Sequence, residues 1–432
     1  MKNLLITILS FFFVFLMFSC SKDEVTSSGG QDINQPETVP MEFIVENGEA
    51  VVTRLPNQEA MTIPSSIDYN NETYTVTTIG SQAYNTKITS LTIPSTIKRI
   101  QENAFVDSKI ETLYIEDLAS WCNIIFEESW HLGNEPYPYC NSNPITPSTK
   151  LFVGGEEIGS ELYITDEVSE ISAYAFQNLN ITKLFTGKDV AVIGQGAFYS
   201  CTNLKDVQFG DNLREISREA FRNSSVSEFT FPSSLEIIGF YAFFDSKILN
   251  KVVFKSTDLN ISIPSFEEVS NVYVPDLDTW YGYEFSYPNS QYYNWAPFTH
   301  YSLYFDGVIL EDLKVTEENS EKANLGRFSG CSSLKSVTFE EGIISSGGFE
   351  SCSSLKTVYL PSTLERFEED FLYHCNSLEG IYLKAKKLPL LTIDVNTLPE
   401  EVVLYVPSES LELYRNSKTW GKFRHIEPLP LE

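Results

Sequence analysis

The sequence predicts a β-rich, right-handed solenoid in which short repeated units stack on one another. Three observations lead to this prediction: a motif that returns at a nearly fixed spacing, short apolar and polar alternations between its copies, and a composition able to fill a core. Of the 432 residues, 42% are hydrophobic, 13% are aromatic and 21% are charged. Such a composition is typical of a folded chain with a large core and not of a disordered one.

The repeated motif is an apolar residue, two others, Ile, three others, Ala and an aromatic residue. Its copies end at Tyr84, Phe105, Phe176, Phe198, Phe221 and Phe243. The last four of these endpoints are 22, 23 and 22 residues apart, and a period in this range indicates a solenoid. A later copy, LERFEEDFL, keeps the same register from Leu364 to Leu372.

Short alternating segments lie between these copies, namely LTIP, LYIE, FTFP, VTFE, VYLP and IYLK. Each predicts a short strand with one buried face. Stacked units would gather one internal column of isoleucines, formed by Ile100, Ile171, Ile193, Ile216 and Ile238, and a second column of aromatics. Alanine before the aromatic leaves room for the backbone of the next unit. We assign the repeats to residues 76–116, 162–275 and 314–404.

Two insertions interrupt the repeats, at residues 117–161 and 276–313. Both open with Asp-Leu and a tryptophan, Trp121 or Trp280, and both close with an alternation around a Gly turn that predicts a hairpin. Recurrence favours a packing role for the two tryptophans. For the unshared Tyr292, Tyr293 and Trp295, packing and ligand contact are equally compatible with the sequence. Residues 41–75, with a predicted hairpin around Asn47 and Gly48, and residues 405–432 are expected to form the caps.

The IxxxAF series and the CxxL turns at Cys201, Cys331, Cys352 and Cys375 resemble the BspA-like, treponemal-type leucine-rich repeats of bacterial surface proteins. The resemblance covers most of the chain from about Val76 onward. It implies a leucine-rich-repeat solenoid with short helical or extended return segments, and it associates the chain with adhesion. At these four turns the sequence favours free buried thiols over disulfides between units. Whether Cys122 and Cys140 pair stays open.

The N-terminus reads as an export signal. Lys2 precedes an apolar run from Leu4 to Phe18, which is shorter than the roughly 20 residues needed to cross a bilayer. We therefore expect a signal peptide at 1–19 and a flexible tether at 20–40. The segment resembles a bacterial lipoprotein signal, and residues 21–24 resemble the tag that sends Bacteroidetes lipoproteins to the cell exterior. This resemblance implies acyl chains on Cys20 and a surface-exposed outer-membrane lipoprotein; the alternative is a plain secretory signal.

Charge and motif content restrict the function. The 30 Lys and Arg against 59 Asp and Glu give a formal net charge of −29, which excludes nucleic acid and favours a neutral or basic partner. The sequence has no HExxH, P-loop or GxSxG motif, and its adjacent acidic pairs would point to opposite faces of a strand. We therefore expect no enzyme activity, no cofactor and no metal.

Outward residues of the predicted strands should form a row, because every strand is one repeat apart and side chains alternate between faces. The row would comprise Thr92, Tyr114, Gln208, Thr230, Thr338, Tyr359 and Tyr382. We hypothesise that a ligand contacts Tyr114, Tyr359 and Tyr382 in this row together with Tyr292, Tyr293 and Trp295. The favoured function is adhesion of a monomeric surface protein to a host or neighbouring-cell protein. The alternatives are glycan binding for nutrient capture and a scaffold role in an envelope assembly.

Overall fold

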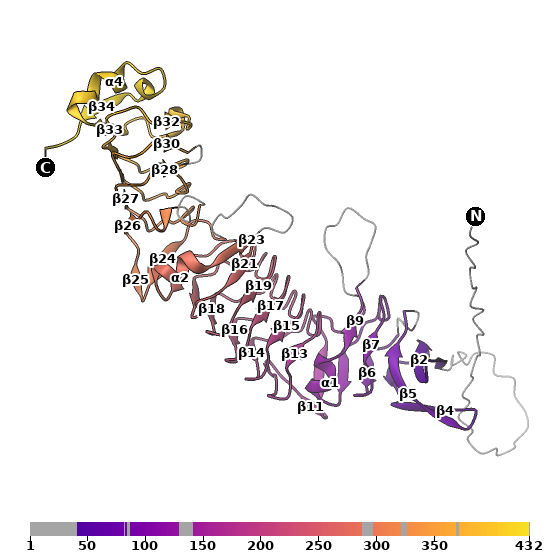
Figure 1. Ribbon diagram of the computed structural model, residues 1–432. Helices are drawn as coiled ribbons and strands as arrows, with labels where there is room; N and C mark the ends of the chain where they lie inside the picture. The colour runs from indigo at the N-terminus through magenta and orange to yellow at the C-terminus, as the bar shows by residue number, and fades with distance from the viewer. Residues whose placement is uncertain are drawn as a thin grey trace, which may run out of the picture. The chain divides into compact units, whose positions relative to one another are not determined.

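The structure is a computed structural model that describes residues 41–81, 83, 87–128, 141–286, 297–320, 326–368 and 371–431. The predicted signal peptide and tether lie outside these residues. The chain divides into two compact units, Met1–Ser160 with Ile171–Asn180 and Glu161–Glu170 with Ile181–Glu432. In both, short parallel strands stack rung upon rung into a β-solenoid (Figure 1).

The first unit has a sheet of parallel strands closed by a hairpin. Its strands are β3 (Ala60–Thr62), β6 (Ser90–Ile93), β8 (Thr112–Ile115) and β10 (Lys150–Val153), with β11 (Glu156–Glu157) antiparallel to β10. A second sheet contains β1 (Glu42–Glu46), β2 (Glu49–Arg54), β4 (Ser66–Tyr69), β5 (Glu72–Ile79), β7 (Arg99–Ile100) and β9 (Ile125–Phe126). β1 and β2 form the predicted hairpin around Asn47 and Gly48, both of which have positive φ. A second hairpin, β4 with β5, is not predicted by the repeat pattern.

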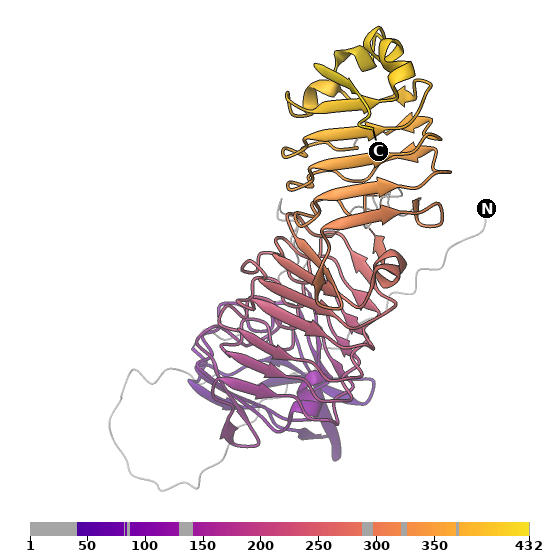
Figure 2. The ribbon, with the colours of Figure 1, turned by 90° about the vertical axis from the view of Figure 1, so that its left-hand side faces the viewer.

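The second unit presents three sheets of outward-facing strands. The first sheet contains β12 (Glu161–Tyr163), β14 (Lys183–Phe185) and β16 (Asp206–Gln208). The second contains β18 (Glu228–Phe231), β20 (Lys251–Phe254), β22 (Asn271–Val274), β24 (Ser302–Phe305) and β25 (Val308–Ile309). The third contains β26 (Asp312–Val315), β27 (Ser336–Phe339), β29 (Thr357–Leu360), β31 (Gly380–Leu383), β33 (Val403–Val406) and β34 (His425–Pro428). Figure 2 shows the parallel strands of the last sheet lying one above another. β25 runs back antiparallel to β24, which is the hairpin predicted at the end of the second insertion.

Shorter strands form the return side of each rung. They are β13 (Glu170–Ile171), β15 (Val192–Ile193), β17 (Glu215–Ile216), β19 (Ile237–Ile238), β21 (Asn260–Ser262), β23 (Glu284–Ser286), β28 (Ser345–Ser346), β30 (Arg366–Phe367) and β32 (Leu390–Leu391). The helices are short: α1 (Leu118–Cys122), α2 (Leu277–Gly282), α4 (Leu411–Arg415) and the 3-10 turns η1 (Val395–Thr397), η2 (Ser408–Ser410) and η3 (Trp420–Lys422).

Columns of identical side chains fill the core. The predicted isoleucine column is fully buried, and the rings of Phe198, Phe221 and Phe243 stack with centroids 5.3 and 5.6 Å apart. The backbone N–H of Phe198 donates to the carbonyl oxygen of Ala220 at 2.8 Å. Alanine is therefore found where the next rung passes close, as the sequence predicts. Cys201, Cys331, Cys352 and Cys375 are buried and form no disulfide, as expected.

Candidate binding surface on the outward sheet face

A row of three tyrosines runs along the last sheet of the second unit. Strand register aligns Tyr359 of β29 with Tyr382 of β31, and Tyr382 with Tyr405 of β33. The same outward row begins with Lys314 and Thr338 and ends with Glu427. We call Tyr359, Tyr382 and Tyr405 the tyrosine ladder. It exists because side chains alternate between the two faces of each strand, and the in-register pairing puts the middle residue of each VYL-type segment on the solvent face.

The rings of the tyrosine ladder cover one another. Their centroids are 4.7 Å apart between Tyr359 and Tyr382 and 4.5 Å apart between Tyr382 and Tyr405, at interplanar angles of 19° and 11°. Because inner ring faces are occupied by neighbouring rings, ring edges and hydroxyl groups are what a partner can contact. Burial, followed by the adjacent tyrosines, raises the pKa of Tyr382, so its hydroxyl stays a neutral donor and acceptor.

Gly380 makes the close ring arrangement sterically possible. It lies at the other outward position of β31, and a Cβ there would stand 3.1 Å from Cε2 of Tyr382 and 3.4 Å from Cε2 of Tyr405. Two of the three rings therefore lie over bare backbone. A glycine weakens a strand, so its presence here is explained by the close approach of these rings.

Ion pairs between successive rungs lie near the tyrosine ladder. Lys335 Nζ is 2.6 Å from a carboxylate oxygen of Glu311, and Lys356 Nζ is 2.7 Å from one of Glu379. Both pairs are exposed, so their contribution to stability is small. Their charges are balanced locally, and this leaves the tyrosine ladder an amphipathic surface without strong charge.

Other outward aromatic pairs occupy the equivalent row in the remaining sheets. In the first unit, Tyr114 packs against Phe152 with ring centroids 4.7 Å apart. In the second unit, the pairs are Tyr163 with Phe185 and Tyr273 with Tyr304, each with centroids 4.4 Å apart. Outward aromatic stacking thus occurs on the outward strands of each unit.

The predicted row is present as a segment in each sheet. Thr92 is in register with Tyr114, Gln208 with Phe185, Thr230 with Val253, and Thr338 with Tyr359. Cys20, Tyr292, Tyr293 and Trp295 lie outside the described residues. Tyr405 is not among the predicted outward residues, because the predicted C-terminal cap begins at residue 405. Its LYVP segment has the same alternation as VYLP, and this signal identifies Tyr405 as an outward residue.

The recurring tryptophans of the insertions are packing residues. Trp121 and Trp280 are buried, and the indole N–H of Trp121 donates to the carbonyl oxygen of Ala175 at 2.9 Å. Each follows an aspartate that caps a short helix: the side chains of Asp117 and Asp276 accept from the backbone N–H groups of Ser120 and Thr279, both at 2.7 Å. Cys122 is buried, while Cys140 lies outside the described residues.

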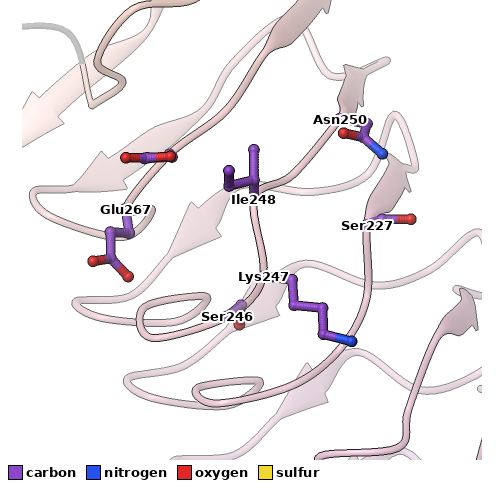
Figure 3. A pocket seen from close by; sticks show the side chains of 7 residues that line it. Ser227, Ser246, Lys247, Ile248, Asn250 and Glu267 are labelled. Carbon is purple, nitrogen blue, oxygen red and sulfur yellow. The ribbon is translucent and has the colours of Figure 1, made fainter.

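A separate hollow of about 620 Å³ lies at the edge of the second unit where β18, β20 and β22 begin. It is lined by Ser227, Ser246, Lys247, Ile248, Asn250, Glu267 and Glu268. Figure 3 shows Glu267 on one side of Ile248, with Ser227 and Asn250 on the other. Within the described part of the chain, the side chains of Lys247, Asn250 and Glu267 form no hydrogen bond or ion pair, so their polar atoms are open to a ligand.

The described residues contain neither a metal-binding cluster nor a membrane-spanning helix. No group of three or more His, Cys, Asp and Glu side chains there is arranged to hold a metal ion. In the same residues, no helix has the length and apolar character needed to cross a bilayer.

Solved structures of similar proteins come from several bacteria. A leucine-rich repeat protein from Bacteroides ovatus is 20% identical over 92% of this chain and 100% of its own, with a TM-score of 0.47. A leucine-rich cell surface protein from Faecalibacterium prausnitzii is 17% identical over 92% and 96%, with a TM-score of 0.40. The pneumococcal vaccine antigen PcpA is 17% identical over 93% and 99%, with a TM-score of 0.38. No curated protein matches the sequence.

A family model settles the classification. The BspA type leucine-rich repeat region matches in six copies over residues 60–134, 160–287 and 301–396, which is well over half of the chain. These ranges contain the IxxxAF motifs, the buried cysteine turns and most of the outward strands described above, whereas β10, β33 and β34 lie outside them. The chain therefore belongs to the family of BspA-type leucine-rich-repeat proteins.

Proposed function

We propose that this protein is a cell-surface adhesion protein that contacts proteins of a host or of neighbouring cells through its outward sheet face. Membership of the family indicates a protein-binding or surface role. The observation that supports the proposal is the tyrosine ladder, whose first residue, Tyr359, is 37% exposed. Tyrosine brings a large, rigid contact area and a polar edge, which is why it is enriched at protein interfaces.

The stacking of the rings favours a protein partner over a sugar at this ladder. A sugar ring packs on an aromatic face, and the faces inside the ladder are covered by neighbouring tyrosines. Ring edges and hydroxyl groups instead suit the backbone amides and side chains of a polypeptide. The proposed partner is neutral or basic, since the chain carries a net charge of −29.

The proposed location follows from the N-terminal sequence. Acyl chains on Cys20 would hold the protein at the outer face of the outer membrane, with residues 20–40 as a tether and the lipid as the sole membrane contact. Labelling cells with radioactive palmitate tests this arrangement. The wild-type protein should carry label, and a Cys20→Ala variant should carry none and be released into the medium.

Matrix-protein and glycan arrays test the function. The protein without residues 1–20 should bind one or more matrix proteins, and binding to a basic partner should weaken as salt rises. Replacing Tyr359, Tyr382 and Tyr405 by Ala should weaken binding by about tenfold or more, because a few aromatic residues carry most of the energy of an interface. Thr230→Ala, on the outward face of another sheet, is the control and should bind normally. Equal binding by all variants would contradict the proposal.

The aromatic insertion extends the proposal to residues outside the described structure. Replacing Tyr292, Tyr293 and Trp295 together by Ala should weaken binding while leaving Tm close to that of the wild type. Unchanged affinity would remove the insertion from the site. A large fall in Tm would show that these rings pack against the fold.

Glycan binding is the second candidate, and the hollow around Ile248 favours it. Its open amide, ammonium and carboxylate groups match the alternating donors and acceptors of a saccharide. Asn250→Ala and Glu267→Gln should each reduce retention on a positive glycan spot, whereas substitution of the tyrosine ladder should not. If the glycan array is blank for the wild type, this candidate fails.

A further inference from the structure

One outward aromatic ring of the second unit has an open face. Tyr163, on β12, is 57% exposed, whereas Tyr359 at the start of the tyrosine ladder is 37% exposed. The ring of Tyr163 lies flat against that of Phe185 on β14, with centroids 4.4 Å apart and an interplanar angle of 0°. Because Phe185 covers one face, the exposed area of Tyr163 belongs to the opposite face and to the ring edge.

Sheet topology explains why this face is open. β12 is the first strand of the sheet β12–β14–β16, so no earlier strand of that sheet lies beside Tyr163. Strand register aligns Tyr163 with Phe185, and Phe185 with Gln208, in the outward row. The strand neighbours of Tyr163 within its sheet therefore all lie on the side of Phe185.

The following sheet shows what covers such a face when an earlier strand is present. Tyr273 on β22 stacks on Tyr304 on β24, with centroids 4.4 Å apart at an angle of 13°. Nζ of Lys251, on the preceding strand β20, lies 5.0 Å from the centroid of the Tyr273 ring. Because β22 lies between β20 and β24, Lys251 and Tyr304 approach Tyr273 from opposite sides. An ammonium group in this position is attracted by the electron-rich ring face.

A carboxylate is held at the edge of the Tyr163 ring. The Tyr163 hydroxyl donates to one carboxylate oxygen of Glu161 at 2.6 Å, and Nζ of Lys183 is 3.0 Å from the other oxygen. Lys183 also interacts electrostatically with the carboxylate of Asp206, which is aligned with it on the neighbouring strand. One ammonium group is thus shared by two carboxylates, and a negative charge remains beside the ring.

The rest of this sheet is also acidic. Its strands and the turns that follow them, at residues 161–167, 183–189 and 205–211, carry six carboxylates and three lysines. Lys188, one of these lysines, is paired with Asp166 at 3.0 Å. An exposed aromatic face with net negative surroundings attracts a cation and disfavours an anion.

We propose that Tyr163, backed by Phe185, is a cation-binding platform that takes an arginine side chain of the protein partner. The guanidinium would lie on the open face of Tyr163, as Lys251 lies on Tyr273, and Glu161 would balance its charge. Arginine suits this position better than lysine, because its planar group stacks on a ring and still donates hydrogen bonds at its edge. The inference rests on the proposed adhesion function, since it names the type of residue with which a neutral or basic partner contacts this sheet.

Saturation-transfer NMR with a short peptide tests the platform. The probe is Gly-Ser-Arg-Ser-Gly, added to the full secreted chain, and the same peptide with citrulline in place of arginine is the uncharged control. Saturation should reach the arginine side-chain protons, and the citrulline peptide should bind about threefold more weakly or worse. Tyr163→Leu removes the ring and should weaken binding of the arginine peptide to a similar extent. Tyr163→Phe keeps the ring face and should bind like the wild type.

Tyr273→Leu is the matched control, because Lys251 already covers that ring. This variant should bind the arginine peptide like the wild type. The inference is overturned if the arginine peptide does not bind, if the citrulline peptide binds equally well, or if Tyr163→Leu leaves binding unchanged. Tighter binding of choline than of the arginine peptide would assign the platform to a quaternary ammonium ligand and would also overturn it.

The matrix-protein array separates this inference from the adhesion proposal. A matrix protein that binds the wild type and Tyr163→Leu equally, without any binding of the arginine peptide, contradicts the platform alone. A blank array with binding of the arginine peptide intact contradicts adhesion to matrix proteins and leaves the platform as a cation-binding site.

Discussion

Phe198 shows how single side chains stabilise the stack. Its ring is fully buried and lies against that of Phe221, with centroids 5.3 Å apart. Phe198→Ala should lower the free energy of unfolding by about 3 to 5 kcal/mol, because a cavity remains between two rungs.

Ile216→Asp, which places a carboxylate in the isoleucine column, should lower the free energy of unfolding by at least about 3 kcal/mol. Gln208→Ala, on the exposed face of β16, should be nearly neutral in urea denaturation; equal effects of all three would contradict this assignment of the core.

Gly380 offers a test of the tyrosine ladder that leaves every tyrosine in place. Gly380→Val adds a side chain where a Cβ already stands 3.1 Å from the ring of Tyr382, so the rings of Tyr382 and Tyr405 must move. Valine also favours strands, which supports the fold. We expect binding of the matrix partner to fall while Tm stays the same or rises. Unchanged affinity would show that ring positions over Gly380 do not matter to the partner.

At the residue scale, the sequence is informative about which side chains point outward and less so about how they pack. Tyr114, Tyr359 and Tyr382 are identified by strand alternation alone, and the same rule applies to Tyr405. The mutual stacking of these rings depends on strand register and on Gly380, and neither follows from alternation within one strand. The backbone of the loop at 384–389 is held by hydrogen bonds from Tyr414 and Trp420, which lie 29 and 31 residues after the carbonyl groups that they contact.

Helix α2 depends on contacts from a later rung. Arg327 occupies the position before the aromatic where other rungs have alanine, and its Nη1 donates to the carbonyl oxygens of Trp280 and Tyr283, at 3.3 and 2.5 Å. Arg327 is 7% exposed. It satisfies carbonyl groups at the C-terminal end of α2, which a helix end leaves without partners. Arg327 therefore connects the second insertion to the rung that follows it.

Arg327→Ala should lower the free energy of unfolding by about 3 kcal/mol, because it leaves buried carbonyl groups unpaired. Asp276→Ala, which removes the N-cap of the same helix, should cost about 1 kcal/mol. Thermal denaturation of the two variants compares the two ends of α2. If Arg327→Ala is the milder change, water or another group satisfies these carbonyls.

At the element scale, repetition is what makes the strands predictable. A strand of four residues gives a weak signal alone, but the same alternation in every rung identifies it. Helices α1 and α2, of 5 and 6 residues, are too short for a 3.6-residue period to appear. Their Asp-Leu openings are capping signals that could have been recognised. The β4–β5 hairpin turns at Asn70 and Asn71, both with positive φ, a turn that favours Asn.

Buried tyrosines make the second unit sensitive to alkali. Burial raises the pKa of Tyr283, Tyr301 and Tyr414 above the ordinary value. Their folded-state pKa exceeds the unfolded one, so the stabilisation is fully present below pH of about 10 and is lost as pH rises beyond it. Tm should therefore fall steeply above that pH, and tyrosinate absorbance should appear together with unfolding. Full tyrosine ionisation while the protein stays folded would contradict this expectation.

Ring spacing along the tyrosine ladder limits how a partner chain can lie on it. At spacings of 4.7 and 4.5 Å, the first and third rings are about 9 Å apart. Side chains on one face of an extended polypeptide recur about every 6.7 Å, and helical turns about every 5.4 Å. Neither period equals the ring spacing. A partner chain that runs along the ladder can therefore place only about two of its side chains against tyrosine rings. A contact this short gives a single molecule low affinity for its partner. Firm attachment then comes from avidity, which is set by the density of copies on a surface.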